Sequence, residues 1–140
     1  MHVSNHIEFF ICLDSASNRV SKRLDRSLGA VHGLGVSDYR VMHQLDVAPG
    51  KVLSRIELAE SVGLTASGIT RLLNPMEKIG LVEKRQNDRD ARVSLVSLSE
   101  IGKQRLSEAR ESFLAVMETS LSKLSQQEKA SLIELLEKIA

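Results

Sequence analysis

The side chains with the most useful chemistry stand in two short stretches in the second half of the chain. Three hydroxyl groups and a guanidinium group occur close together, at Thr65, Ser67, Thr70 and Arg71. Further on, Arg89 and Arg92 stand on either side of Asp90. Hydroxyl and guanidinium groups are hydrogen-bond donors that suit phosphate oxygens and nucleotide bases. The two stretches therefore indicate ligand binding rather than catalysis. The kind of ligand depends on the helices or strands that position these side chains.

The sequence offers little to an enzyme. It contains no G-x-S-x-G nucleophile motif, no glycine-rich phosphate loop and no H-E-x-x-H zinc motif. Its single cysteine, Cys12, excludes an internal disulfide and gives no paired ligand spacing for a metal. His2 and His6 share a helical spacing near the chain end, which we interpret as coincidence, and His32 and His43 are interpreted as structural. We expect no catalytic activity, no metal and no cofactor.

Length and composition predict one mainly helical globular domain. The chain has 140 residues, of which 42% are hydrophobic and 3% aromatic, a composition that suits an aliphatic core. Its apolar runs are too short for a signal sequence or a membrane span, so we expect a cytoplasmic protein without membrane contact. The net charge of +1 is low for a nucleic-acid-binding protein, so any basic surface has to be local. Between Thr65 and Arg92, six basic residues stand against four acidic ones.

Apolar residues at helical spacing predict two helices in the first third of the chain. From about residue 3 to residue 28 they recur at the i, i+3, i+4, i+7 positions of one long amphipathic helix. Three glycines between Gly29 and Gly35 should end this helix. Ser37 is then expected to cap a second helix that runs to about Ala48, where a Pro-Gly pair follows.

Two short helices with a glycine turn between them come next. The capping box Ser54-Arg55-Ile56-Glu57 should begin the first, and Gly63 should end it. Thr65 can cap the second helix. The apolar stripe of that second helix consists of Ile69, Leu72, Leu73, Met76 and Ile79. This is the pattern of a helix-turn-helix whose second helix presents small and polar residues at its start.

After Gly80 the pattern becomes that of a β-hairpin and then returns to helix. Residues 81–85 and 93–98 are the expected strands, and the C-terminal third predicts one helix from about Ile101. A last helix should follow the capping box Ser125-Gln126-Gln127-Glu128. The first and last helices carry more apolar surface than a small domain can cover, so we infer that they form a dimer interface. An intramolecular helical bundle is the alternative.

Residues 81–98, LVEKRQNDRDARVSLVSL, followed by SEIG, resemble the wing signature of the multiple-antibiotic-resistance (MarR-type) regulators of bacteria. The Asp90-x-Arg92 and Ser99-x-x-Gly102 patterns fall at the spacing of that family. Upstream, the runs Glu57-Leu58-Ala59, Thr70-Arg71-Leu72 and Glu77-Lys78-Ile79-Gly80-Leu81-Val82 resemble the family's helix-turn-helix in order and spacing. The resemblance covers residues 36–102 by motif and the flanking helices by pattern.

The resemblance implies a fold, a division of the chain and a partner. The fold class is mainly α, a winged helix-turn-helix with N- and C-terminal dimerisation helices in a single domain. Residues 1–35 and 99–140 would form the dimerisation region, and residues 36–98 the DNA-binding lobe. The implied function is that of a homodimeric, ligand-responsive repressor on double-stranded DNA, bound at a pseudo-palindromic operator with its recognition helices in successive major grooves.

The same resemblance assigns roles to the polar residues. Thr65, Ser67, Thr70 and Arg71 become candidates for phosphate and base-edge contacts, because a helix N-terminus favours phosphate and small residues there permit close approach. Arg89 and Arg92 become candidates for the minor groove, where negative potential is concentrated, and Asp90 would orient Arg92. The alternative for these wing residues is a surface ion pair on a turn.

The chain departs from the family pattern at two positions. Pro75, inside the recognition helix, is expected to kink that helix. Ala91 stands where the wing of the family often has the first of two arginines, so only Arg92 is carried over.

The sequence says less about the signal that would control DNA binding than about DNA binding itself. The family commonly responds to small, often phenolic, anions held between the dimerisation helices and the DNA-binding lobe, where Tyr39 and Arg40 fall; Tyr39 can also be a core residue. The peroxide-sensing branch of the family carries a reactive cysteine on its first helix, as Cys12 is here. The apolar neighbours of Cys12 favour a buried, inert thiol instead. Two alternatives stay open: redox sensing through Cys12, and a helical interaction protein without DNA binding.

Overall fold

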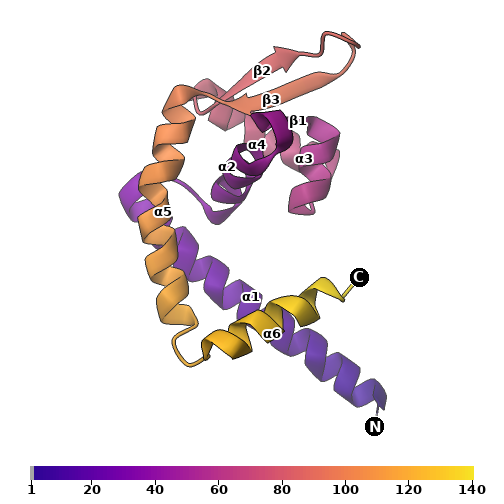
Figure 1. The fold of residues 1–140 in the computed structure, drawn as a ribbon, viewed down its shortest axis with the longest axis vertical. Helices are drawn as coiled ribbons and strands as arrows, with labels where there is room; N and C mark the ends of the chain where they lie inside the picture. The colour runs from indigo at the N-terminus through magenta and orange to yellow at the C-terminus, as the bar shows by residue number, and fades with distance from the viewer. Residues whose placement is uncertain (1) are drawn as a thin grey trace.

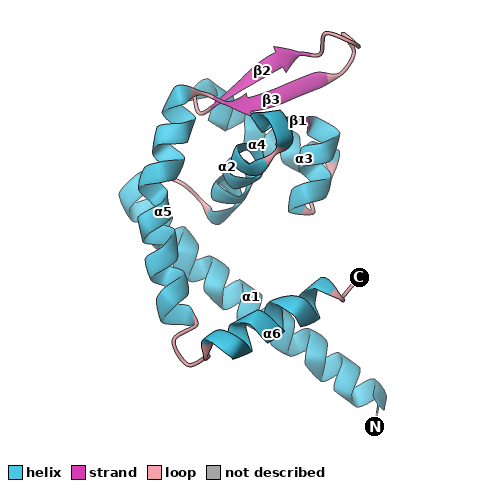
Figure 2. Cartoon of the chain, viewed as in Figure 1, coloured by secondary structure: helices cyan, strands magenta, loops and turns pink. Residues whose placement is uncertain are grey.

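The computed structural model describes residues 2–140, with side chains from residue 5 onward, and its fold is mainly helical as predicted. Two long helices, α1 (His2–His32) and α5 (Glu100–Ser120), pack against each other along one side of the molecule (Figure 1). The shorter helices α2 (Val36–Val47), α3 (Arg55–Val62) and α4 (Ala66–Lys78) form a compact lobe beside them (Figure 2). Helix α6 (Gln126–Glu137) turns back toward α1 at the C-terminal end.

The prediction that α1 ends before Gly29 is wrong, because the helix continues to His32. Gly33 ends it in the left-handed conformation, with φ of 66°. The additional turn is anchored to α5, where Nε2 of His32 lies 2.9 Å from Oγ of Ser112 and an Arg105 nitrogen donates to the carbonyl oxygen of His32. A glycine inside a helix costs about 1 kcal/mol relative to alanine. These tertiary contacts offset that cost.

The predicted cap of α2 is also wrong, because Gly35 and not Ser37 precedes its first turn. The backbone nitrogen of Gly35 donates to the carboxylate of Asp38 at 2.8 Å. The next nitrogen, that of Val36, donates at 2.7 Å to Asp25, a residue of α1. The start of α2 is therefore satisfied partly by a carboxylate from a distant helix, which local sequence patterns do not reveal.

The caps predicted for the helix-turn-helix are confirmed. Ser54 accepts from the backbone nitrogen of Glu57 at 3.1 Å, and the Glu57 carboxylate accepts from that of Ser54 at 3.0 Å. Gly63 ends α3 with φ of 70°, and Thr65 caps α4 by accepting from the nitrogen of Gly68 at 3.1 Å. Helix α4 continues through Pro75, and the kink expected there stays a prediction. Ile79, expected in the buried stripe, follows the last turn of the helix and is exposed.

The hairpin of β2 (Val82–Gln86) and β3 (Ser94–Leu98) forms the wing, and a third strand joins it. This strand, β1 (Val52–Ser54), follows the short 3-10 helix η1 (Pro49–Lys51) and pairs antiparallel with β3, with Leu53 opposite Val96. The strand order is β1-β3-β2. Strand β1 was not predicted, because its three residues are too few to show the alternation of a strand. Through β1, the wing is hydrogen-bonded to the start of α3.

The core lies where the lobe meets α1 and α5. Its largest fully buried side chains are apolar and come from α1 to α5, from β3 and from the turn after α4: Leu28, Val41, Met42, Leu45, Leu58, Ile69, Leu73, Leu81, Val96 and Leu106. The apolar stripe predicted for α4 supplies Ile69, Leu73 and Met76 to this core. The buried face of α4 leaves its opposite face free for a partner.

The end of α4 and the start of α5 meet at one tight junction. The Ser99 hydroxyl lies within hydrogen-bond distance of the carbonyl oxygens of Gly80 and Leu81. The same hydroxyl accepts from the backbone nitrogen of Gly102 at 2.9 Å, and the nitrogen of Ser99 donates to Leu81 at 3.0 Å. A Cβ atom on Gly102 would lie 2.1 Å from the carbonyl oxygen of Leu81, so only glycine fits there.

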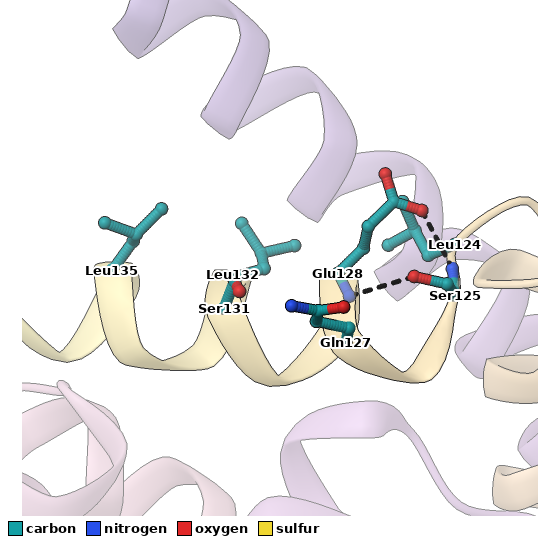
Figure 3. Close-up of a pocket in the computed structure, with 7 residues that line it drawn as sticks. All are labelled: Leu124, Ser125, Gln127, Glu128, Ser131, Leu132 and Leu135. Atoms are coloured by element: carbon teal, nitrogen blue, oxygen red, sulfur yellow. Dashed lines mark hydrogen bonds between the residues drawn. The ribbon is translucent and has the colours of Figure 1, made fainter.

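Apolar side chains of α1 and α6 remain exposed in the single chain. In the first half of α1 they are Ile7, Phe9, Phe10, Ile11 and Leu13, and on α6 they are Leu132, Ile133, Leu135 and Leu136. A groove of about 530 Å³ runs between the two helices and includes Cys12. Figure 3 shows Leu132 and Leu135 pointing to the same side of α6, which begins at the capping box of Ser125 and Glu128.

The prediction that Cys12 is buried is therefore wrong for the single chain, where its side chain is exposed. The apolar residues around Cys12 lie at the surface with it and do not cover the thiol. Burial of this face depends on what packs against it.

No helix in the described part of the chain is both long and apolar enough to cross a membrane.

Candidate nucleic-acid interface

The first turn of α4 brings exposed hydroxyl groups together, as the sequence predicts. Thr65 and Ser67 are both exposed, and their hydroxyl oxygens lie 3.2 Å apart. The Thr65 oxygen also accepts from the backbone nitrogen of Gly68, so this side chain already serves as the helix cap. The hydroxyl of Ser67 has only Thr65 as its partner among the described residues. Ser67 is therefore the freer of the two hydroxyls for an external acceptor.

Arg71 and Thr70 differ in how free they are. The side chain of Arg71 is exposed on α4, one turn after Ser67, and forms no ion pair with any residue of the described chain. Thr70 is half-buried, and its hydroxyl donates to the carbonyl oxygen of Ala66 at 3.1 Å. The same oxygen accepts from Nη1 of Arg55 at 3.1 Å. Arg71 is thus available for DNA, whereas the Thr70 hydroxyl is largely engaged within the protein.

Arg55 is a residue of this surface that sequence analysis missed. It is the first residue of α3, and its guanidinium group reaches α4 at Thr70. In the sequence it stands inside a capping box, a motif that is defined by its serine and glutamate and assigns no role to the residue between them. Its position next to α4 follows from the packing of α3 on α4, which no local pattern reports.

The wing carries a bidentate ion pair between Asp90 and Arg92. Nε and Nη2 of Arg92 donate to the two carboxylate oxygens of Asp90 at 3.1 and 3.3 Å. The backbone nitrogen of Arg92 donates to the same carboxylate at 3.0 Å. The Arg92 side chain is still 91% exposed. Two parallel hydrogen bonds fix the direction of the guanidinium plane and leave its outer edge open to solvent.

These contacts lower the pKa of Asp90. The larger cause is the side-chain hydrogen bond from Arg92, and the backbone nitrogen of Arg92 adds to it. Both favour the charged carboxylate. Any stability that the pair provides is therefore present above the unfolded pKa of about 4 and is lost as the pH falls through the folded pKa. At neutral pH the pair is fully charged.

Other wing residues are exposed and basic. Arg89 is exposed, and its backbone nitrogen donates to the side chain of Asn87 at 2.9 Å in the wing loop. Arg85 is exposed on β2, and Lys84 pairs with Glu77 of α4 at 3.7 Å. The wing thus presents several positive charges around the Asp90 and Arg92 pair.

A separate groove contains Tyr39 and Arg40, the candidate effector residues. It has a volume of about 330 Å³, lies between α2 and α5, and is lined by Tyr39, Arg40, His43, Gln44, Arg110, Phe113 and Leu114. The ring of Tyr39 is buried and stacks on Phe113 with ring centroids 4.3 Å apart, so Tyr39 also belongs to the core. Nη2 of Arg40 donates to the carbonyl oxygen of Val62, the last residue of α3, at 2.7 Å.

The histidines separate into different environments. His32 contacts Ser112, and His43 lines the groove beside Arg40. The side chain of His2 lies outside the described residues, so the spacing of His2 and His6 stays an interpretation. Among the described side chains, no three His, Cys, Asp or Glu residues gather where they could hold a metal ion.

Known proteins share both the sequence pattern and the fold. The sequence model described as MarR family matches residues 32–93. The HTH-type transcriptional regulator YxaD of Bacillus subtilis is 34% identical over 117 residues, which cover 83% of this chain and 80% of the relative. The HTH-type transcriptional repressor YetL of the same organism is 25% identical over 145 residues, 96% of this chain and 87% of the relative. Matches to two other HTH-type regulators span only 51% and 66% of their lengths.

A solved structure has the same fold at low identity. The structure of a mutant MarR protein from E. coli, complexed with operator DNA, superposes with a TM-score of 0.85. The aligned region covers 96% of this chain and 94% of the other, at 19% identity. This likeness shows that the winged helix-turn-helix and the flanking helices share one arrangement.

If the ion pair between Asp90 and Arg92 is present in solution, the pKa of Asp90 depends on Arg92. Arg92→Ala should raise the pKa of Asp90 toward its ordinary value of about 3.9, because both the guanidinium donors and the fixed geometry are lost. Carboxyl chemical shifts followed by NMR across a pH titration measure this. Glu57, whose pKa is lowered by the backbone nitrogen and hydroxyl of Ser54, provides the internal control and should not change. An unchanged pKa of Asp90 in the variant would show that the pair does not persist in solution.

Proposed function

Because this chain belongs to the MarR family of winged helix-turn-helix DNA-binding transcriptional regulators, we propose that it is a dimeric, sequence-specific repressor whose DNA binding is controlled by a small anionic effector. The family consists of regulators and not of enzymes. Double-stranded DNA is the proposed partner, and the cytoplasm is the proposed place of action. A pseudo-palindromic operator follows from a two-fold symmetric dimer, since two identical recognition helices read the same sequence on opposite strands.

The observation that carries the proposal is the unpaired and exposed Arg71 beside the open Ser67 hydroxyl at the start of α4. We assign base-edge and phosphate contacts to Ser67 and Arg71. Thr65 and Thr70 contribute mainly by shaping this surface, since their hydroxyls are engaged in hydrogen bonds within the protein. The positive end of the α4 dipole adds attraction for a phosphate.

In the wing, we assign a minor-groove or phosphate contact to Arg92 and to Arg89. The bidentate contact with Asp90 supports an orienting role for that carboxylate, since it restricts the guanidinium without covering it. A guanidinium that is fixed before binding loses less side-chain entropy when it meets DNA. The relative YetL is named a transcriptional repressor, which supports repression rather than activation.

The dimer is supported by the apolar faces of α1 and α6. Large apolar side chains such as Phe10, which is 63% exposed, and Leu135, which is 58% exposed, lie on these two helices. Soluble monomers rarely expose contiguous apolar patches of this kind, because burying them gains about 25 cal/mol per Å². A second copy that contributes the same helices would cover both faces. Such an interface would also cover Cys12, which makes redox sensing through this thiol the less supported alternative.

The effector proposal rests on the groove between α2 and α5. Arg40 and Arg110 supply two guanidinium groups beside the apolar surface of Phe113 and Leu114, a combination that suits a small phenolic or other aromatic anion. Arg110 forms an ion pair with Asp46 at 3.8 Å, so an anion would compete with this carboxylate. An anion that attracts Arg40 would also weaken its hydrogen bond to Val62, at the turn before α4. This links the groove to the DNA-binding surface.

Dimerisation is tested by placing a charge on the exposed face of α6. Leu135→Asp should dissociate the dimer while leaving the fold intact, because Leu135 is already 58% exposed in a single chain. Sedimentation equilibrium at micromolar concentration measures the mass. Gln126→Asp adds the same charge to the first, polar position of the same helix and should remain dimeric. A wild-type protein that sediments as a monomer would refute the proposed dimer.

DNA binding is tested on an operator selected from fragments of the source genome with purified protein. Arg92→Ala should weaken operator binding and flatten the dependence of log K on log salt concentration by about one unit per protomer. Asp90→Ala should also weaken binding, although it removes a negative charge, because Arg92 loses its orientation. Fluorescence anisotropy over a range of salt concentrations measures both quantities.

The control for the wing is Asp88→Ala, which removes a neighbouring negative charge without altering the Asp90 and Arg92 pair. It should tighten binding slightly, as simple electrostatics predicts. If Asp90→Ala tightens binding in the same way and Arg92→Ala has no effect, the wing pair is only a surface turn.

Ligand response is tested with 4-hydroxybenzoate as the probe. It should lower the operator affinity of the wild type by at least about fivefold, the lower end of allosteric coupling. Arg110→Gln should reduce this response while leaving operator affinity unchanged without the probe, since Arg110 lies on α5 away from α4. The neutral analogue 4-hydroxybenzyl alcohol provides the control. Equal effects of the anion and the alcohol would contradict an arginine-based anion site.

A further inference from the structure

The contact between Arg55 and Thr70 joins the two helices of the helix-turn-helix. Arg55 begins α3, and Thr70 lies in the second turn of α4. Nη1 of Arg55 donates to the Thr70 hydroxyl at 3.1 Å, and both residues are half-buried. No other side-chain hydrogen bond links α3 and α4 in the described part of the chain. Arg55 is therefore held against the helix that we assign to DNA reading.

The hydrogen-bonding capacity of Thr70 limits what its hydroxyl can do for DNA. A hydroxyl group has one proton to donate and two lone pairs that accept. The proton goes to the carbonyl oxygen of Ala66, and one lone pair accepts from Arg55. Phosphate oxygens only accept, so they cannot bond to the lone pair that remains. As long as both hydrogen bonds persist, Thr70 can affect DNA binding only by holding Arg55 in position.

Arg55 retains both donors and charge for a partner. A guanidinium group has five N–H donors, and Thr70 takes one of them. The basic residues that pair with carboxylates in the described chain are Lys51, Lys84, Arg92, Lys103 and Arg110. Arg55 is not among them, although Glu57 is only two residues away, because residues two positions apart on a helix do not face each other. No carboxylate of the described residues forms an ion pair with Arg55.

We propose that Arg55 is a phosphate-binding residue of the DNA interface, held against the recognition helix by Thr70. This proposal rests on the DNA-binding role of α4 described above. A helix that lies in the major groove has a phosphate strand along each side. A side chain that reaches such a helix from the neighbouring helix meets the strand on that side before it meets base edges. The fixed guanidinium then offers its remaining donors in the fork geometry that suits phosphate oxygens.

The first experiment measures how operator affinity depends on salt concentration for variants of Arg55. Arg55→Met keeps the aliphatic stem and removes the charge, so the slope of log K against log salt concentration should fall by about 0.9 for each protomer. Arg55→Lys keeps the charge and should keep most of the slope. Arg26→Ala removes the same charge from an exposed position on α1 and should change neither slope nor affinity.

The second experiment tests whether Thr70 positions Arg55. Thr70→Val removes the hydroxyl at nearly the same volume and should weaken operator binding several-fold, whereas Thr70→Ser keeps the hydroxyl and should bind like the wild type. Once Arg55 is Met, Thr70→Val should have no further effect on DNA binding, because the two residues act as one unit. Fully additive losses for the two substitutions would overturn the positioning role.

The outcomes separate this inference from the proposed function. Arg71→Ala serves as the reference for the interface as a whole. If Arg71→Ala weakens binding and flattens the slope but Arg55→Met does not change the slope, Arg55 is only a brace between α3 and α4 and our inference is wrong. Urea unfolding of Arg55→Met would then show a loss of stability without a change in salt dependence. If neither variant changes DNA binding, the assignment of α4 to DNA is wrong as well.

Discussion

The junction of Ser99 and Gly102 with the end of α4 is the constraint on which the DNA-binding half of the molecule depends. Recognition helix and wing can meet one DNA site together only if the chain between them is fixed. The Ser99 hydroxyl holds Gly80 and Leu81, and the backbone of α5 approaches Leu81 so closely that a Cβ atom on Gly102 would lie 2.1 Å from its carbonyl oxygen. These contacts therefore join the end of α4, the base of the wing and the start of the long helix α5.

The distribution of charge explains how a protein of net charge +1 can present a positive surface. Several carboxylates are used within the protein. Asp46 pairs with Lys51 and Arg110, while Asp25, Asp38 and Glu57 accept from backbone nitrogens at helix starts. Around α4 and the wing, Arg55, Arg71, Arg85 and Arg89 form no ion pair with other described residues.

The features that could be predicted from the sequence are those determined by neighbouring residues along the chain. The capping boxes at Ser54 and Ser125, the left-handed Gly63 and the Asp90-x-Arg92 spacing are all local, and each predicted its element. The failures involve partners far away in the sequence. Gly29 stays helical because α5 holds the end of α1, Asp25 replaces the cap expected from Ser37, and Arg55 meets Thr70 only when α3 packs on α4. The apolar neighbours of Cys12 along the chain predicted burial, but in the single chain they lie at the surface with the exposed thiol.

The contact between Asp25 and Val36 has a consequence for the modularity of the fold. A carboxylate of α1 accepts the hydrogen bond from the first backbone nitrogen of α2, at 2.7 Å, so the lobe that contains the helix-turn-helix begins at a cap supplied by the long helix α1. A fragment cut before Val36 would expose that nitrogen and lose the packing of Leu24 and Leu28 against the lobe. The winged lobe is therefore not independent of α1, and transferring it to another protein requires the second half of α1 as well.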